Sequence, residues 1–479
     1  MDGTSGRRVV VVGAGIAGLA AAWHLHRGDP TLKITVLDGA PRTGGKLFSS
    51  EVGGVEIDAG AEAMLARRPE GKELARHVGL GDALVSPGTT TSAILSRGAL
   101  RLLPKGHVMG VPSDVAALAR SGILTPGGLA RVPMDQILPP TLVTTDVSVA
   151  AYIRARVGGE VVDRMIEPLL GGVYAGRAET LSLEATMPGV AAAARTERSL
   201  LKAARDLAAK APKDAGPVFT TLKGGLGGLP AAVAEASGAE VRTGVMVRDL
   251  VRTPDGWRLI TGPTRDEQVV EADAVVLAVP ATAAARLLER EAPRAAAELA
   301  GIEYASMAIV TLASPRSAFP EPPSGSGYLV PPVEGRPVKA VTFSTTKWPH
   351  LGEADPNLVL VRCSIGRLGE EALLQRDDAE LVAFAMNEMT ETMGVRGLPI
   401  DTRVTRWGGA LPQYDVGHLD RVARARAAVA DHPGLALCGA AYDGVGIPAC
   451  IATGRTAAAR VLEHLNARPA AGPKEEPDG

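Results

Sequence analysis

The feature that most constrains the fold of this chain is a glycine-rich turn between a valine run and a helical pattern near the N-terminus. Val9–Val12 has the pattern of a buried strand, the turn 13–18 reads GAGIAG, and a helical pattern runs from Leu19 to Arg27. In a GxGxxG turn the first glycine permits the tight bend, the second lets a pyrophosphate approach the backbone, and the third lets helix and strand pack closely. The sequence therefore predicts a dinucleotide-binding βαβ unit over residues 7–38.

Asp38 closes the second strand of this unit, 33–38, about 20 residues past the turn, where a carboxylate binds ribose hydroxyls. A carboxylate at this position also disfavours the 2′-phosphate of NADP. A purely structural turn and a surface acid are the alternatives. The order of strand, turn, helix and acid favours nucleotide binding.

The bulk composition excludes several classes of protein. The chain has 479 residues, 46% of them hydrophobic, so it can bury a large core in two or three domains. Lys and Arg (51) nearly cancel Asp and Glu (53), so no overall field indicates a nucleic acid partner. The chain has three cysteines, too few for a disulfide framework. Neither these cysteines nor the eight histidines have the spacing of metal ligands, so we expect no metal site. No stretch reaches the roughly 18 apolar residues of a membrane-spanning helix. We therefore expect a cytoplasmic protein, and peripheral contact with the inner face of the membrane is an open alternative.

The strand patterns recur along the chain and indicate an α/β fold with insertions. A strand-rich stretch at 239–262 and a buried-strand pattern at 274–279 suggest a return to the first domain. Between 95 and 215, prolines divide helix-forming sequence into short pieces, which indicates an inserted helical cap or a membrane-facing domain. Strand patterns and a helical pattern at 379–393 predict an α+β substrate domain.

We therefore expect a Rossmann-like nucleotide-binding domain with an α+β domain and a helical cap. The predicted segments are the nucleotide-binding domain at 1–94, 216–299 and 406–465, the cap at 95–215, the α+β domain at 300–405, and a disordered tail at 466–479.

The cofactor is narrowed to FAD by the residues that follow Asp38. Residues 41–46, PRTGGK, resemble the RxGGK/R element of the glutathione-reductase-like flavoproteins, in which paired glycines approach the phosphates and basic residues offset their charge. A solvated turn is the alternative for this stretch. Residues 53–61 resemble the segment where those proteins pass the flavin.

Further blocks make the whole chain resemble one family, the FAD-dependent porphyrinogen oxidases of haem synthesis, in particular the type of Gram-positive bacteria that oxidises coproporphyrinogen III. These blocks are 60–68, 104–106, 166–176, 347–350, 406–418 and 444–448. The resemblance implies a glutathione-reductase or amine-oxidase type of fold with bound FAD. The FAD contacts that it implies, together with the phosphate-loop residues Arg42 and Gly45, are Gly13, Ala14, Gly15, Ile16, Ala17, Gly18, Asp38, Gly39, Lys46, Gly60, Ala61, Glu62, Ala63, Val247, Trp407, Val445, Gly446 and Ile447.

The implied reaction is hydride transfer from the methylene bridges of a porphyrinogen to the flavin, repeated three times, with O₂ reoxidising the flavin to give hydrogen peroxide. No catalytic base is evident in the sequence. Because the substrate carries propionates, its site should be apolar with cations at the rim. The candidates are Arg67, Arg68, Leu169, Leu170, Tyr174, and more weakly Lys347 and Arg177. A solvated helix start for the arginines and plain core packing for the leucines are the alternatives.

Several rivals stay open at this point. Protoporphyrinogen IX is the alternative substrate. An amine oxidase needs an aromatic cage, and only Tyr442 stands near the C-terminal block, while a carotenoid desaturase would need a strong hold on membrane. A binder that shares the architecture without using flavin is disfavoured by the intact glycines. A downstream ferrochelatase is a partner that the resemblance leaves open, and the oligomeric state is not predicted.

Overall fold

The structure is a computed structural model that describes residues 6–141, 143–210, 216–353 and 355–467. The chain forms two compact units, each assembled from separate segments. Unit 1 contains Met1–Gly45, Leu229–Gly301 and Val422–Gly479, and unit 2 contains Lys46–Gly228 and Ile302–Arg421. The chain therefore passes between the units more than once.

Unit 1 is built on a parallel sheet, whose strands in spatial order are β10 (Glu240–Thr243), β2 (Lys33–Asp38), β1 (Arg8–Val12), β14 (Ala274–Leu277) and β20 (Leu435–Leu437). β1 and β14 lie in the middle, and Val9–Val12 and β14 are buried, as continuous apolar runs in a parallel sheet require. An antiparallel sheet of β11 (Val247–Thr253), β12 (Gly256–Thr261) and β13 (Gln268–Ala272) belongs to the same unit. The predicted βαβ unit is confirmed by β1, α1 and β2.

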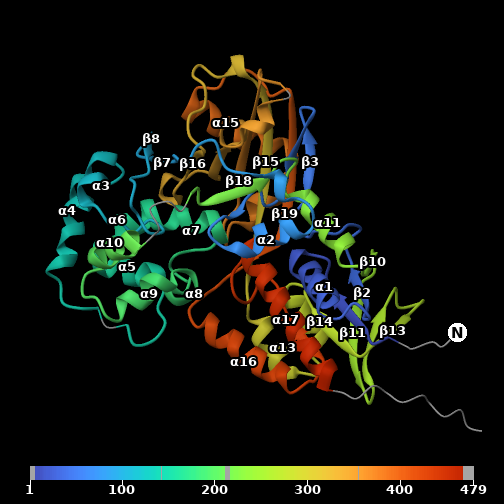
Figure 1. The fold of residues 1–479 in the computed structure, drawn as a ribbon. Helices are drawn as coiled ribbons and strands as arrows, with labels where there is room; N and C mark the ends of the chain where they lie inside the picture. The colour runs from blue at the N-terminus through green and yellow to red at the C-terminus, as the bar shows by residue number, and fades with distance from the viewer. Residues whose placement is uncertain (1–5, 142, 211–215, 354, 468–479) are drawn as a thin grey trace, which may run out of the picture. The chain divides into compact units, whose positions relative to one another are not determined.

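Five helices lie wholly in unit 1, among its described residues. They are α1 (Ile16–Gly28), α11 (Leu229–Ala236), α12 (Ala281–Leu288), α13 (Pro293–Ala300) and α17 (Ile447–Ala467). α1 packs against α17 (Figure 1). Their backbones touch because a Cβ on Gly454 would collide with the carbonyl of Ala17, so only glycine fits there.

Unit 2 is organised around a mixed sheet, in the spatial order β19 (Asp401–Pro412), β15 (Tyr304–Pro315), β18 (Leu358–Ile365), β17 (Val338–Phe343), β16 (Gly327–Leu329), β7 (Ala93–Ser96) and β8 (Ala99–Leu102). α15 (Asp378–Met393) packs on this sheet through Leu381, Ala385 and Met389. Smaller strands complete the sheets of unit 2: β3 (Ser49–Val52), β4 (Val55–Asp58), β5 (Met64–Leu65), β6 (Leu84–Val85) and β9 (Phe219–Leu222). The α/β fold class predicted from the sequence is confirmed.

A helical region of unit 2 lies in the sequence between β8 and β9. Its helices are α3 (Val115–Ser121), α4 (Pro126–Arg131), α5 (Val149–Val157), α6 (Gly159–Val161), α7 (Glu167–Tyr174), α8 (Leu183–Thr186), α9 (Pro188–Ala194) and α10 (Leu200–Lys210). The short lengths follow from local signals: Pro126 opens α4, and the side chain of Asp114 caps α3 by accepting from the N–H groups of Ala116 and Ala117. The remaining helices are α2 (Pro69–His77) and α14 (Ser344–Lys347) in unit 2, and α16 (His418–Ala430), which crosses the division between the units.

The observed division is coarser than the six segments expected from the sequence, which stay a prediction. Residues 95–102, expected in the cap, contribute to β7 and to β8 of the large sheet. Residues 46–94, expected in the nucleotide-binding domain, cluster with unit 2. The expected disordered tail lies outside the described residues, apart from the last two residues of α17.

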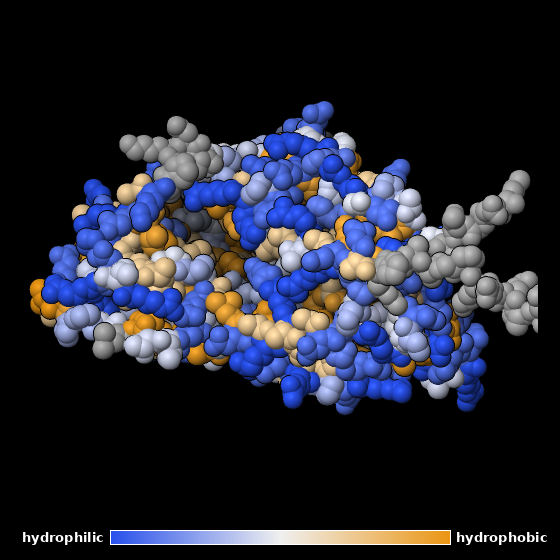
Figure 2. All heavy atoms as spheres, turned by 60° about the horizontal axis from the view of Figure 1, so that its bottom comes forward, coloured by the Kyte–Doolittle hydropathy of each residue, from blue (hydrophilic) through white to orange (hydrophobic). Residues whose placement is uncertain are grey.

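Hydrophobic residues on the face shown in Figure 2 form small patches among hydrophilic ones. Of the helices in the described ranges, none is both long and apolar enough to span a bilayer.

A buried ion pair ties the helical region together. The Nε of Arg156, on α5, donates to Oδ1 of Asp135 at 2.6 Å, and the two side chains are 1% and 0% exposed. The second carboxylate oxygen of Asp135 accepts from the Ser199 hydroxyl and from the Leu201 amide at the start of α10. Three segments of chain therefore meet at one carboxylate whose hydrogen bonds are satisfied.

We expect Arg156→Met to destabilise the protein by about 3–5 kcal/mol, because it leaves the Asp135 charge buried without its ionic partner. The matched control is Arg154→Met, which removes a 43% exposed arginine from the same helix and should cost less than about 1 kcal/mol. Urea unfolding of the two variants measures the difference. Equal midpoints for the two variants would contradict the assigned role.

Candidate functional site

The glycine turn of unit 1 has the geometry that its sequence predicts. Gly13 has a φ of 111°, and a Cβ there would stand 2.6 Å from the carbonyl oxygen of Ala278. A Cβ on Gly18 would collide with the carbonyl of Gly13. A Cβ on Gly15, by contrast, would meet no atom within 4 Å. Gly13 and Gly18 are therefore needed by the fold, whereas the space at Gly15 suits the close approach of a ligand.

The N-terminus of α1 opens at this space. Its N-cap is Gly15, which offers no side-chain oxygen, and no acidic residue lies in the first turn. The first N–H groups of a helix have no partner within the helix and carry its positive dipole end, so this turn suits a phosphate.

Asp38 holds the neighbouring loops through backbone amides. Its carboxylate accepts from the Ala14 amide at 2.6 Å and from the Ala40 amide at 2.8 Å. Each carboxylate oxygen keeps a second lone pair for a ribose hydroxyl. Asp38 therefore both fixes the turn and remains able to bind a nucleotide.

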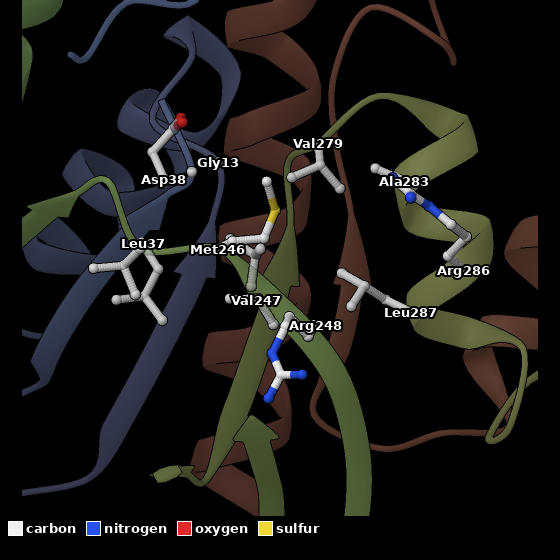
Figure 3. A pocket seen from close by; sticks show the side chains of 13 residues that line it. Gly13, Leu37, Asp38, Met246, Val247, Arg248, Val279, Ala283, Arg286 and Leu287 are labelled. Atoms are coloured by element: carbon white, nitrogen blue, oxygen red, sulfur yellow. The ribbon is translucent and has the colours of Figure 1, made fainter. Parts of the chain in front are cut away.

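A pocket of about 240 Å³ lies beside Asp38 in unit 1. In Figure 3, Asp38 and Gly13 lie on one side, Arg286 and Ala283 of α12 lie on the other, and Met246 and Val279 stand between. Val247 also lines the pocket. The volume is small for a whole cofactor and suits one end of a dinucleotide.

The predicted phosphate loop packs against the glycine turn. The Gly44 amide donates to the carbonyl of Ala14 at 2.8 Å, and Gly44 and Gly45 both have positive φ, which glycine alone adopts without strain. The guanidinium of Arg42 donates to the carbonyls of Thr43 and Gly45. Arg42 thus closes its own loop, a role that the sequence did not indicate.

The C-terminal block lies at the start of a second long helix. Ile447 is the first residue of α17, and Val445 and Gly446 precede it. No acidic residue lies in the first turn of α17. Tyr442 is fully buried, with the guanidinium of Arg426 5.6 Å from its ring centre.

Gly39 lines the pocket beside Asp38 in unit 1. The other predicted cofactor residues lie in unit 2, from Lys46 through the loop Gly60–Ala63, and at Trp407. The side chain of Glu62 is held by Lys347, whose Nζ donates at 2.5 Å, and by Arg362. Burial opposes the charge on Glu62, but the charges of Lys347 and Arg362 and their hydrogen bonds outweigh it and lower its pKa to about 2. Trp407 donates from its Nε1 to the carbonyl of Ala59 at 2.9 Å.

The predicted substrate-binding residues all lie in unit 2, and their charged side chains differ in exposure and in ion pairing. Arg67 is exposed and makes no ion pair with another described residue, whereas Arg68 pairs with Glu70 at 2.8 Å. Lys347 is only 15% exposed, and its charge is already matched by Glu62. Among the predicted substrate-binding cations, Arg67 is the one that makes no ion pair with another described residue.

The apolar candidates lie on or beside α7. Leu169 is half-buried, Leu170 is fully buried, and Tyr174 packs against Tyr414 with ring centres 5.6 Å apart. Burial raises the pKa of Tyr174 to about 12, so its phenol stays protonated. Arg177 is committed to Glu370 at 3.0 Å.

Two residues of this region were missed from the sequence. Arg362 interrupts the apolar strand β18 and contacts the Gly60–Ala63 loop, and a lone charge in a buried strand was the available signal. Asp58 accepts from the amides of Leu226 and Gly227, and burial raises its pKa against these hydrogen bonds. No group of His, Cys, Asp and Glu that could hold a metal occurs among residues 6–467 that the structure describes.

Comparison with known proteins places these features in a family. Residues 16–462 match the family described as flavin containing amine oxidoreductase. Coproporphyrinogen III oxidase of Mycobacterium tuberculosis (strain ATCC 25618 / H37Rv) is 40% identical over 96% of this chain and 99% of its own, and the Bacillus subtilis (strain 168) enzyme of that name is 33% identical over 96% and 98%. A crystal structure from Exiguobacterium sp. 255-15, provisionally described as a protoporphyrinogen oxidase, has a TM-score of 0.85 at 31% identity and covers 96% of this chain and 100% of its own.

The family match and the full-length relatives agree with the nucleotide-binding features of unit 1, which are the glycine turn, Asp38 and the loop that follows it. The chain belongs to the flavin-containing amine oxidoreductase family and groups within it with the coproporphyrinogen III oxidases.

Proposed function

We propose that this chain is an oxygen-dependent FAD oxidase that converts coproporphyrinogen III to coproporphyrin III in haem biosynthesis, with release of hydrogen peroxide. The observation that carries the proposal is 40% identity over nearly the full length to a protein of that activity. The turn at 13–18 supports it, because it combines a helix N-terminus with open space at Gly15.

The residues of unit 1 fit the dinucleotide part of FAD. We assign the pyrophosphate to the amides at the start of α1, since the helix carries no acid in its first turn that would repel it. We assign the ribose to Asp38, whose second lone pairs remain for hydroxyl groups. Val247, which lines the same pocket, is assigned a contact with the nucleoside. The proposed contacts of Val445, Gly446 and Ile447 rest on the second helix N-terminus, that of α17.

FAD, when bound, supplies the hydride acceptor for each of the three oxidations. The part assigned to the protein is to bind and orient the porphyrinogen. We assign a propionate to Arg67, because its guanidinium is exposed and unpaired among the described residues. Arg68 and Lys347, which already have carboxylate partners, are assigned weaker roles, and Leu169 is the proposed apolar contact. Tyr174 stays a prediction with less support, since its ring packs on Tyr414 in the core.

The proposal includes delivery of the porphyrin product to a ferrochelatase, and a cytoplasmic location with peripheral membrane contact. An amine oxidase is disfavoured by Tyr442, which is buried beneath Arg426 and presents no open aromatic face to an amine. Oxidation of protoporphyrinogen IX is the second candidate, favoured by the name of the related Exiguobacterium structure.

The substrate test compares oxygen uptake with coproporphyrinogen III and with protoporphyrinogen IX. We expect a higher kcat/KM for coproporphyrinogen III and one peroxide formed for each O₂ consumed. Equal or reversed preference would overturn the choice of substrate. Oxidation without peroxide would overturn the choice of oxygen as acceptor.

The cofactor test is Gly15→Ala. Because the added Cβ meets no protein atom within 4 Å, the variant should fold, but the methyl group would occupy the space assigned to the pyrophosphate. We expect FAD to bind roughly tenfold more weakly or worse, which corresponds to about 1.4 kcal/mol. The control is Gly127→Ala, at an exposed position in α4 with ordinary contacts. The FAD that each variant retains is measured from its visible flavin absorbance after dialysis. Unchanged FAD binding in Gly15→Ala would refute the assignment of the pyrophosphate to this turn.

The propionate test is Arg67→Ala. Loss of a charge-assisted hydrogen bond, about 1.5–3 kcal/mol, should raise KM for coproporphyrinogen III roughly ten- to hundredfold while kcat changes little. Arg68→Ala should have a smaller effect, because Arg68 is paired with Glu70. Arg76→Ala, on the exposed side of α2, is the control. If KM is unchanged when both Arg67 and Arg68 are replaced, the assignment is wrong.

A further inference from the structure

The antiparallel pair of β5 and β9, in unit 2, places two large apolar side chains in solvent. Met64 lies opposite Thr220, and Leu65 lies opposite Phe219. Successive side chains of a strand point to opposite faces, so each opposed pair has its own face. Met64 and Thr220 are buried, whereas Leu65 and Phe219 are 38% and 43% exposed. The outer face of this pair of strands is therefore apolar.

Phe219 differs from the other phenylalanines of the chain. All five lie within the described ranges, and only Phe219 is exposed. The neighbouring strand β6 pairs with β9 at Leu222 and at Thr221, and it ends before it reaches Phe219. A phenyl ring in water forgoes the free energy that burial of its apolar surface supplies. A ligand that covers Leu65 and Phe219 together would recover this free energy.

A fixed cation restricts the ring of Phe219. The Nζ of Lys347 lies 5.6 Å from the centre of the Phe219 ring and 5.2 Å from that of Trp348. Lys347 itself is held by the carboxylate of Glu62 at 2.5 Å. An ammonium over a ring face attracts it, so Lys347 limits the movement of the Phe219 side chain. A side chain that is already ordered loses less conformational entropy when a ligand packs on it.

A cation without an ion pair lies next to this apolar face. Arg67 follows Leu65 by two residues, and the amide of Ala66 donates to the carbonyl of Val218 at 2.8 Å. α2 begins at Pro69, so the backbone is anchored on both sides of Arg67. Arg67 is exposed and forms no ion pair with another described residue. An apolar pair and an uncompensated positive charge therefore occur within one short stretch of chain.

We propose that Leu65 and Phe219 form a platform on which the apolar macrocycle of the porphyrinogen packs while one of its carboxylates pairs with Arg67. The proposal rests on the proposed function and adds Leu65 and Phe219 to the substrate contacts. Complementarity carries it, because the substrate combines apolar surface with negative charge at its edge, and this part of unit 2 combines an apolar pair with a positive charge. Phe219 then contributes affinity for the macrocycle, and Arg67 recognises the carboxylate.

The test is a fluorescence titration of the FAD-loaded protein with coproporphyrin III and with its full methyl ester, which lacks the negative charges. Phe219→Ala should raise the Kd of both porphyrins by a similar factor, roughly five- to fiftyfold, because it removes an apolar contact. Arg67→Ala should raise the Kd of coproporphyrin III and leave that of the ester unchanged. Phe219→Leu keeps an apolar side chain and should retain most of the affinity.

The matched pair is Leu65→Ala and Leu398→Ala, since Leu398 is another exposed leucine of unit 2. Leu65→Ala should raise the Kd of both porphyrins roughly two- to tenfold, whereas Leu398→Ala should change neither. Leu65→Ala also decides the matter if Phe219→Ala does not fold.

Unchanged affinity for both porphyrins in the variants of Leu65 and Phe219 would overturn the platform, even if the wild-type protein prefers coproporphyrinogen III. Conversely, a wild-type preference for protoporphyrinogen IX in oxygen uptake would overturn the proposed substrate. The platform would still be supported in that case by weaker binding of both porphyrins to the variants.

Discussion

The packing of unit 1 depends on close contacts between backbone segments at its glycines. Gly18 lies against Gly13, Gly13 lies against Ala278 at the end of β14, and Gly454 brings α17 onto α1. No side chain larger than hydrogen fits at these points. Because α1 and α17 both pack on β14, the sheet sets the position of their N-termini, to which we assigned the phosphates of the cofactor and the flavin contacts.

Much of the nucleotide-binding part of unit 1 could be predicted from the sequence, because the residues that determine it are close together in the chain. The strand, turn, helix and acid at 7–38 lie within one supersecondary unit, and periodicity with glycine spacing specifies each part. The confirmed family resemblance extended the prediction to the whole chain, since blocks such as 406–418 and 444–448 carry it.

The rest of the candidate site depends on partners that are distant in the sequence. The cofactor contact predicted for the backbone at Glu62 stays a prediction. The carboxylate of Glu62 is held by Lys347 and Arg362, roughly 300 residues away, and the sequence did not indicate this pairing. Tyr174 was predicted to line a substrate slot, which stays a prediction, and the packing of its ring on Tyr414 was not indicated by the sequence. Periodicity identifies a buried face but does not identify the residue that packs on it, so these pairings appear only in the folded chain.

The segmented composition of the two units has a consequence for synthesis on the ribosome. β1 and α1 emerge first, whereas β20 and α17, which complete the sheet and cover α1, are made roughly 400 residues later, on the order of 20–80 s at usual elongation rates. During that interval the alanine- and glycine-rich face of α1 has no partner, so the nascent chain exposes apolar surface until nearly its last helix is made. Such exposed apolar surface makes a folding intermediate prone to aggregation.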